Sequence, residues 1–152
     1  MTRIRSFKLK DYRDVIQIWS RTATKEREAK TLQMLVHQLA CDRDLVVVAE
    51  QDNEVVGAIM GIKHHSRGFF YCLAVSPDHQ SKGIGRQLVS ELEERLYQKG
   101  AKRLLVMVDE GTEKLTDFYR YLGFDQTCSS TVAKEVYVNT PADISTLRTQ
   151  NA

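Results

Sequence analysis

The stretch of sequence that decides the fold runs from Phe69 to Gln87 and reads FFYCLAVSPDHQSKGIGRQ. Its first seven residues, 69–75, are apolar or aromatic and rich in strand formers, which predicts a short buried strand. The segment Ser76-Pro77-Asp78 ends this strand because proline cannot donate a hydrogen bond to a sheet ladder. A loop with two glycines follows, and a long helical pattern begins directly behind it.

This loop and the helix start predict a binding site for a phosphate or pyrophosphate. Amide N–H groups in the first turn of a helix have no intrahelical partner, and the helix dipole places partial positive charge there. Gly83 and Gly85 lack a Cβ atom, which lets the backbone approach an anion closely, and Lys82 and Arg86 add full positive charges. The predicted ligand is therefore an anion of the phosphate class.

The glycine spacing excludes two common nucleotide-binding loops. A P-loop would need lysine and then serine or threonine after Gly85, where Arg86 and Gln87 stand. A dinucleotide-binding fingerprint would need a third glycine in place of Leu88.

The residues do resemble the acetyl-coenzyme A loop of the GNAT superfamily of N-acetyltransferases. That loop has the pattern Gln/Arg-x-x-Gly-x-Gly/Ala, which reads QSKGIG at 80–85 in this chain. The segment LAVSP at 73–77 precedes it at the usual distance, and FYRYLGF at 118–124 stands where the family has Phe-Tyr-x-x-x-Gly-Phe. Together these three segments make the resemblance strong over roughly residues 4–138.

The resemblance implies an α/β (α+β) fold with a mixed, mostly antiparallel central sheet flanked by helices. Its two parallel central strands are expected to splay into a V-shaped cleft. We expect one N-acetyltransferase domain over residues 1–152, in which 141–152 form a polar C-terminal tail.

The hydrophobic pattern predicts elements in the same order. Strand 69–75, helix 84–100 and strand 103–108 form a crossover unit, so the two strands should be parallel. Asp11 is expected to cap the first helix or to lie in its first turn. The other expected elements are strand 4–8, helix 10–24, helix 26–40, a hairpin of strands 45–50 and 55–63, helix 113–121 and an antiparallel pair at 124–128 and 133–138.

Composition and charge narrow the class of protein. The 152 residues are 42% hydrophobic and 28% charged, and the formal charge of +2 gives no reason to expect a nucleic-acid partner. No apolar run approaches a membrane span and no signal-peptide core follows Met1, so we expect a cytoplasmic protein without a membrane partner. The sequence leaves open whether the protein forms a homodimer. Three widely spaced cysteines, Cys41, Cys72 and Cys128, suit reduced thiols, and no metal site is predicted.

The resemblance also assigns roles to individual residues. Backbone groups of the central strand at Leu73, Ala74 and Val75 would bind the pantetheine arm and the thioester oxygen of acetyl-coenzyme A. Tyr119 would be the general acid that protonates the leaving thiolate, and its alternative is a buried tyrosine with a structural hydrogen bond. The residues expected at the pyrophosphate are Gln80, Ser81, Lys82, Gly83, Ile84, Gly85 and Arg86.

Two positions depart from the family pattern, and the general base is unresolved. Thr112 stands where asparagine is frequent; it can cap the next helix and is carried over as a cofactor contact. Leu115 replaces a small residue and would crowd the cofactor. Tyr121 is expected to be structural, and Cys72 a core residue. The candidate bases are Asp109, Glu110, Glu26 and Glu28, while His64 and His65 are expected to be exposed and His79 to make a minor anion contact.

The function that this resemblance implies is acetyl-coenzyme A dependent transfer of an acetyl group to a primary amine by direct attack. A small-molecule amine is the favoured acceptor, and a protein N-terminus or lysine is the alternative. An alternative function from a different class is that of a non-catalytic module that binds acetyl-coenzyme A. The departures from the family pattern at 112 and 115 are the only residues in the sequence that favour it.

Overall fold

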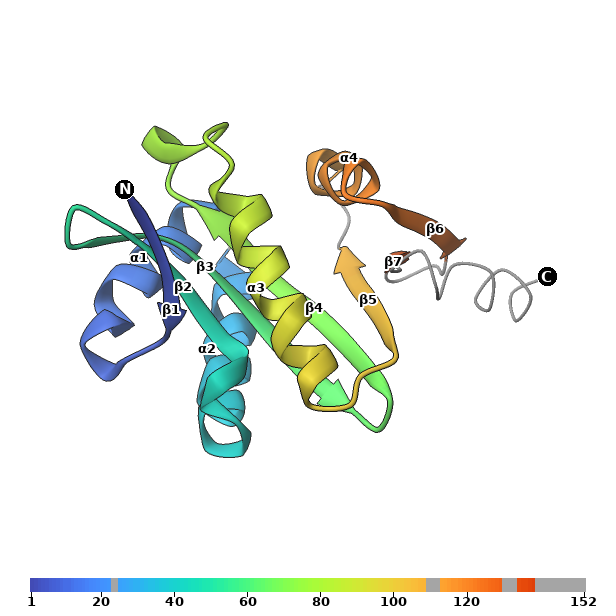
Figure 1. The fold of residues 1–152 in the computed structure, drawn as a ribbon. Helices are drawn as coiled ribbons and strands as arrows, with labels where there is room; N and C mark the ends of the chain where they lie inside the picture. The colour runs from blue at the N-terminus through green and yellow to red at the C-terminus, as the bar shows by residue number, and fades with distance from the viewer. Residues whose placement is uncertain (23–24, 109–112, 130–133, 139–152) are drawn as a thin grey trace.

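The computed structural model describes residues 1–22, 25–108, 113–129 and 134–138, and it describes side chains at 1–21, 31–106 and 117–124. The helices are arranged around one sheet (Figure 1). The sheet has seven strands in the order β1-β2-β3-β4-β5-β7-β6. The strands are β1 (Thr2–Ser6), β2 (Val46–Gln51), β3 (Glu54–His64), β4 (Arg67–Val75), β5 (Arg103–Val108), β6 (Phe124–Ser129) and β7 (Lys134–Val138). The helices are α1 (Tyr12–Thr22), α2 (Lys25–Cys41), α3 (Ile84–Gln98) and α4 (Glu113–Tyr121), and three 3-10 turns are η1 (Leu9–Asp11), η2 (Arg43–Leu45) and η3 (Pro77–His79).

The sheet is mixed, as the sequence predicts. The pair β4–β5 is parallel, and the other described pairs are antiparallel. The helix α3 connects β4 to β5, which is the crossover expected between parallel strands. The last two strands pair with each other as expected, and β7, not β6, lies beside β5. The expected tail at 141–152 lies outside the described residues.

The first strand begins and ends earlier than the predicted range of 4–8. Phe7 N still donates to Val46 O at 2.9 Å, but Lys8 then opens the turn η1, whose Asp11 carboxylate accepts from Lys8 N at 2.8 Å. Asp11 therefore caps this 3-10 turn, one residue before α1. The hairpin β2–β3 turns at Asp52 and Asn53, which both have positive φ (53° and 65°), as a two-residue hairpin turn of the primed type requires.

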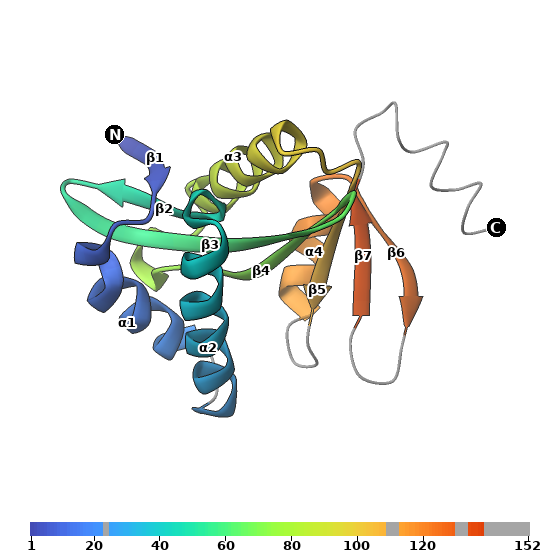
Figure 2. The ribbon, with the colours of Figure 1, turned by 90° about the horizontal axis from the view of Figure 1, so that it is seen from below.

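Helices cover both faces of the sheet and bury two hydrophobic clusters. Figure 2 shows α3 on one side of the sheet and α1 and α2 on the other. The predicted stripe of α3 is fully buried and joins the first cluster: Ile84, Leu88, Leu92 and Leu96. The second cluster lies under α1 and α2 and contains Val15, Ile18, Trp19 and Leu35.

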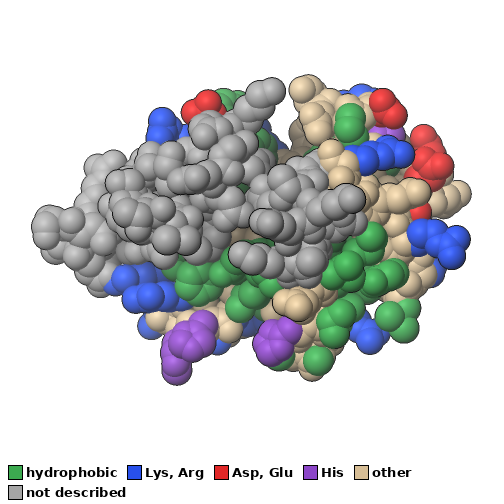
Figure 3. Space-filling view, turned by 180° about the vertical axis from the view of Figure 1, so that it is seen from behind, with side chains coloured by type: hydrophobic (Ala, Val, Ile, Leu, Met, Phe, Trp, Pro, Cys, Tyr) green, Lys and Arg blue, Asp and Glu red, His purple; other side chains and the backbone are tan. Residues whose placement is uncertain are grey.

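The face opposite to that of Figure 1 combines apolar and charged surface. Figure 3 shows hydrophobic side chains gathered beside the grey atoms, with charged side chains of both signs scattered around them. Among the large hydrophobic residues that stay exposed are Tyr12 at the start of α1 and Val36 on α2. Within the described part of the chain, no helix has the length and apolar character needed to cross a membrane.

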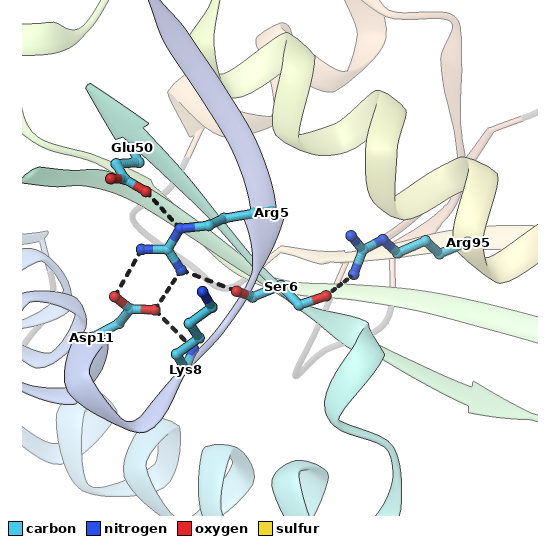
Figure 4. A network of polar contacts seen from close by, with 6 residues as sticks. All are labelled: Arg5, Ser6, Lys8, Asp11, Glu50 and Arg95. Atoms are coloured by element: carbon cyan, nitrogen blue, oxygen red, sulfur yellow. Dashed lines mark hydrogen bonds and ion pairs between the residues drawn. The ribbon is translucent and has the colours of Figure 1, made fainter. Parts of the chain in front are cut away.

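A polar network fastens the first strand to its neighbours (Figure 4). Arg5 donates to both carboxylate oxygens of Asp11, at 2.7 and 2.9 Å, and to Glu50 Oε2 at 2.6 Å. On the other side of β1, Arg95 of α3 donates to Ser6 Oγ at 2.7 Å. Burial alone would raise the pKa of Asp11, but hydrogen bonds from Arg5 and from Lys8 N outweigh burial and lower it. The network thus ties together β1, β2, α3 and the turn that leads into α1.

We expect the substitution Arg5→Met to lower the free energy of unfolding by about 2–3 kcal/mol at pH 7, because the Asp11 side chain is only 3% exposed and would lose its charge partner. The pH dependence follows from the lowered pKa of Asp11. Its contribution is present above the ordinary value of 3.8 and is lost as pH falls through the folded-state pKa.

Urea unfolding of both proteins between pH 3 and 8 measures this contribution. The free energies of unfolding of the wild type and of Arg5→Met should converge at low pH, because protonated Asp11 carries no charge for Arg5 to neutralise. A constant difference over the whole range would contradict an electrostatic role for the pair.

Candidate functional site

The two parallel strands β4 and β5 separate halfway along their length. Their pairing covers four residues of each strand and ends at Phe70 and Val106, although β4 continues to Val75. Figure 1 shows β5 leaving β4 toward the end of the sheet where α4 lies. One edge of β4 beyond Phe70 is therefore not paired with β5, as expected for splayed central strands.

A β-bulge lies in β4 directly after the point of separation. Met60 pairs with Tyr71 and Ala58 pairs with Ala74, so one residue of β3 faces two residues of β4, Cys72 and Leu73. Cys72 has a φ of +57°, in the left-handed region that non-glycine residues seldom adopt. Its carbonyl oxygen accepts a hydrogen bond of 2.7 Å from Trp19 Nε1 on α1.

The bulge decides which amides of β4 face the free edge. Ser76 N donates to Val56 O of β3 at 2.7 Å. Because neighbouring residues of an extended strand direct their N–H groups to opposite sides, Val75 and Leu73 direct theirs away from β3. Ala74, between them, packs its side chain into the second hydrophobic cluster. The N–H groups of Leu73 and Val75 therefore lie on the edge of β4 that does not pair with β5 beyond Phe70.

The loop between β4 and α3 is held by its own backbone and by Gln80. Gln80 Nε2 donates to Val75 O at 3.0 Å, so this side chain fastens the loop to the end of β4. Ser81 and Gly83 have positive φ, 64° and 82°. Lys82 is exposed, whereas the Ile84 side chain is buried, which leaves its backbone N–H as the group that can serve a ligand.

The start of α3 has the features of an anion site. Gly83 is the N-cap residue, no side chain of the described residues caps this helix end, and the first turn contains no acidic residue. The first intrahelical bond runs from Gln87 N to Gly83 O, so the N–H groups of Ile84, Gly85 and Arg86 precede the helical ladder. Among the described residues, apart from the two chain neighbours of Gly83, no atom lies within 4 Å of its Cβ position, so the loop is open there.

Gly85 has a packing role in addition to the role expected from the motif. A Cβ atom on Gly85 would lie 3.2 Å from Phe118 Cζ on α4. A glycine at this position therefore permits close contact between α3 and α4, and through Phe118 it connects the loop to the helix that carries Tyr119.

A cavity of about 390 Å³ lies between α3 and α4. Tyr121 lines it and is 79% exposed, so its side chain does not pack in the hydrophobic core. Burial raises the pKa of Glu93, and the neighbouring charge of Glu94 raises it further. In the sequence, only the helical spacing of Arg86, Ser90 and Glu93 indicates that these polar residues lie on one face of α3. The lining residues are Arg86, Val89, Ser90, Glu93, Tyr121 and Leu122.

Tyr119 lies in an aromatic group next to the bulge. Its ring centroid is 5.1 Å from that of Phe124, 5.3 Å from that of Phe118 and 6.4 Å from that of Phe70, against which it stacks. The residue is 2% exposed, and burial followed by the nearby charge of Cys72 raises the pKa of its phenol. Burial therefore stabilises the protonated form of the Tyr119 phenol over the phenolate.

The remaining expected site residues divide into described and undescribed positions. His64 and His65 contact each other ring edge to face, 4.4 Å between centroids, around the β3–β4 turn. His79 Nδ1 is buried and has no hydrogen-bond partner in the part of the chain that the structure describes. Cys72 is half-buried with Sγ 3.5 Å from Thr31 Oγ1 and packs against the second cluster. No metal-binding group of three acidic, histidine or cysteine side chains occurs among the described residues. Outside them lie Thr112, Asp109, Glu110 and the side chains of Glu26, Glu28 and Leu115.

Comparisons with known proteins agree with this geometry. A profile of the acetyltransferase (GNAT) family matches residues 12–124. An acetyltransferase of Pectobacterium atrosepticum is 32% identical over 88% of this chain and 94% of its own length, and one of Sodalis glossinidius is 34% identical over 80% and 86%. The crystal structure of the PaiA N-acetyltransferase of Thermoplasma acidophilum, in complex with coenzyme A, superposes with a TM-score of 0.76 at 17% identity, over 92% of this chain and 99% of that one.

Proposed function

Because this chain belongs to the acetyltransferase (GNAT) family, we propose that it transfers the acetyl group of acetyl-coenzyme A to a primary amine. In this reaction the amine nitrogen forms a bond to the acetyl carbonyl carbon. The carbon–sulfur bond breaks, and its electron pair leaves with the sulfur. The sulfur takes a proton, and the nitrogen loses one to a base or to water.

The observation that carries the proposal is the position of two donor sets on one continuous segment. The unpaired edge of β4 offers the N–H groups of Leu73 and Val75, and the uncapped start of α3 offers those of Ile84, Gly85 and Arg86. The first set suits a carbonyl oxygen that gains negative charge, and the second suits a pyrophosphate. A pantetheine arm connects these two groups in acetyl-coenzyme A, and the loop 76–83 connects the two donor sets in this chain.

The other residues of the motif have supporting roles in this proposal. Lys82 and the guanidinium of Arg86 add charge beside the pyrophosphate, and Ser81 and Gly83 shape the turn with their positive φ values. Gln80 holds the loop to Val75 O. Tyr119 Oη donates the proton that the leaving sulfur takes, and Thr112 stays a predicted cofactor contact.

The favoured acceptor is a small-molecule amine, and a protein N-terminus or lysine is the alternative within the same reaction class. We propose that residues 1–152 act as one catalytic domain in the cytoplasm. A thiol-release assay with small diamines, amino acids and short peptides separates the acceptor classes. Sedimentation of the purified chain decides whether it forms a homodimer.

Calorimetric titration with acetyl-coenzyme A, coenzyme A and ATP tests the proposal. We expect both forms of coenzyme A to bind with a Kd on the order of micromolar and ATP to bind at least ~10-fold more weakly, because ATP lacks the pantetheine arm that would lie along β4. Absence of binding to all three ligands would remove the proposed function.

The non-catalytic alternative makes a different prediction for the same protein. Saturable binding of acetyl-coenzyme A without thiol release, in the presence of every amine class tested, would favour a binding module over an enzyme.

A further inference from the structure

We infer that Trp19 is a positioning residue, whose indole N–H holds the Cys72 bulge and thereby directs the amides of Leu73 and Val75 to the free edge of β4. This inference rests on the proposed function, because it concerns the amides that would contact the thioester oxygen. Trp19 itself belongs to α1 and would act through the backbone of β4.

The bulge needs support because Cys72 is not a glycine. A φ of +57° brings the Cβ atom of an L-residue close to its own backbone, so this conformation persists only where the surrounding structure holds it. The hydrogen bond from Trp19 Nε1 acts directly on the strained residue, since Cys72 O is the acceptor.

Trp19 is well placed to supply this support. Its side chain is 3% exposed and packs in the second cluster together with Val15 and Ile18 of the same helix. The indole is therefore fixed by its apolar contacts, and its donor reaches the bulge at 2.7 Å. Thr31 of α2 approaches the Cys72 thiol from the same side of the sheet, with 3.5 Å between Oγ1 and Sγ.

Loss of the bulge would reverse the amides that follow it. The extra residue lies between the pairs Met60–Tyr71 and Ala58–Ala74. If it were removed, Ala58 would pair with Leu73, and each later residue of β4 would shift by one. Leu73 and Val75 would then direct their N–H groups to β3, and the free edge would present the amides of Ala74 and Ser76 instead.

The test is the substitution Trp19→Phe, which keeps an aromatic ring in the cluster and removes the donor. In the protein without ligand, amide hydrogen exchange should slow at least ~10-fold at Leu73 and Val75 and quicken at Ser76, because the pairing with β3 changes. In the presence of acetyl-coenzyme A labelled with ¹³C at the carbonyl, the shift of the bound carbonyl resonance should move toward its value in water.

The kinetics of Trp19→Phe should separate an effect on the thioester site from an effect on the pyrophosphate loop. We expect kcat to fall about fivefold, while the Kd of coenzyme A without the acetyl group stays within about twofold, because the loop 80–86 is unchanged. A matched pair of second substitutions separates backbone strain from lost packing. Cys72→Gly in the Trp19→Phe background should restore exchange pattern and kcat, since glycine adopts positive φ freely, whereas Cys72→Ala should restore neither.

The outcomes distinguish the two proposals. If the wild-type protein turns over acetyl-coenzyme A and the Trp19→Phe variant keeps the same amide exchange and carbonyl resonance, the role of Trp19 is contradicted. The proposed function would then still stand. Wild-type protein that never binds coenzyme A overturns the proposed function, and the exchange measurement then still decides whether Trp19 holds the bulge. If Cys72→Gly and Cys72→Ala restored kcat equally, the loss of kcat would come from the Cys72 thiol and not from backbone strain. That result would also contradict the inference.

Discussion

The variant Tyr119→Phe is expected to lower kcat about 100-fold and to leave the Kd of acetyl-coenzyme A within about twofold. Phenylalanine keeps the ring contacts with Phe70, Phe118 and Phe124, so the aromatic group should remain intact. The only group removed is the phenolic hydroxyl, which is the proposed proton donor to the leaving sulfur. Single-turnover measurement with a saturating amine acceptor isolates this step from product release.

Tyr121→Phe is the matched control, because it removes the same hydroxyl from an exposed residue on the same helix. It should leave kcat within about twofold. The pH dependence provides a second check. The pKa of Tyr119 is raised, so the acid form persists on the alkaline side beyond the ordinary value of 10.0. An unchanged kcat in Tyr119→Phe would leave this tyrosine with a packing role, which was the alternative reading of its sequence position.

Local signals in the sequence predict most of the fold. Strand 103–108 and helix 113–121 begin and end where the pattern places them, because glycines and polar residues interrupt the apolar periodicity at these points. The crossover between β4 and β5 follows from one general rule of chain connection. The position of β7 between β5 and β6 does not follow from the local sequence pattern. The orders β5-β7-β6 and β5-β6-β7 both leave β6 and β7 as an antiparallel pair.

The site was predictable to a lesser extent because its shape depends on contacts between distant residues. The motif locates the loop 80–85, but the bulge at Cys72 lies inside an uninterrupted apolar run that gives no sign of an extra residue. Its support comes from Trp19, which is 53 residues earlier in the chain. Likewise, the pattern of α4 gives Tyr121 an apolar character, and only the packing of α4 on α3 exposes it.

The substitution Gly83→Val should weaken binding of coenzyme A about 30-fold. Gly83 combines a φ of +82° with a Cβ position that no described atom beyond its chain neighbours approaches within 4 Å, so a valine there would strain the backbone without a steric clash against the described residues. The strained loop would turn its amides away from the position that a pyrophosphate needs, and the branched side chain would occupy the space in front of them. Calorimetric titration with coenzyme A measures the loss.

Reduced stability alone could imitate this result, so the experiment needs a variant with similar strain at another place. Gly100 supplies it, because it has a φ of +102° just beyond the opposite end of α3, where the nearest atom to its Cβ position is Lys63 Cε at 3.7 Å. Both Gly83→Val and Gly100→Val should lose about 1–3 kcal/mol of stability in urea. Only Gly83→Val should lose affinity, because only that end of the helix presents unpaired N–H groups to an anion. Equal affinities in the two variants would move the pyrophosphate away from the start of α3, and the motif at 80–85 would then be a structural turn.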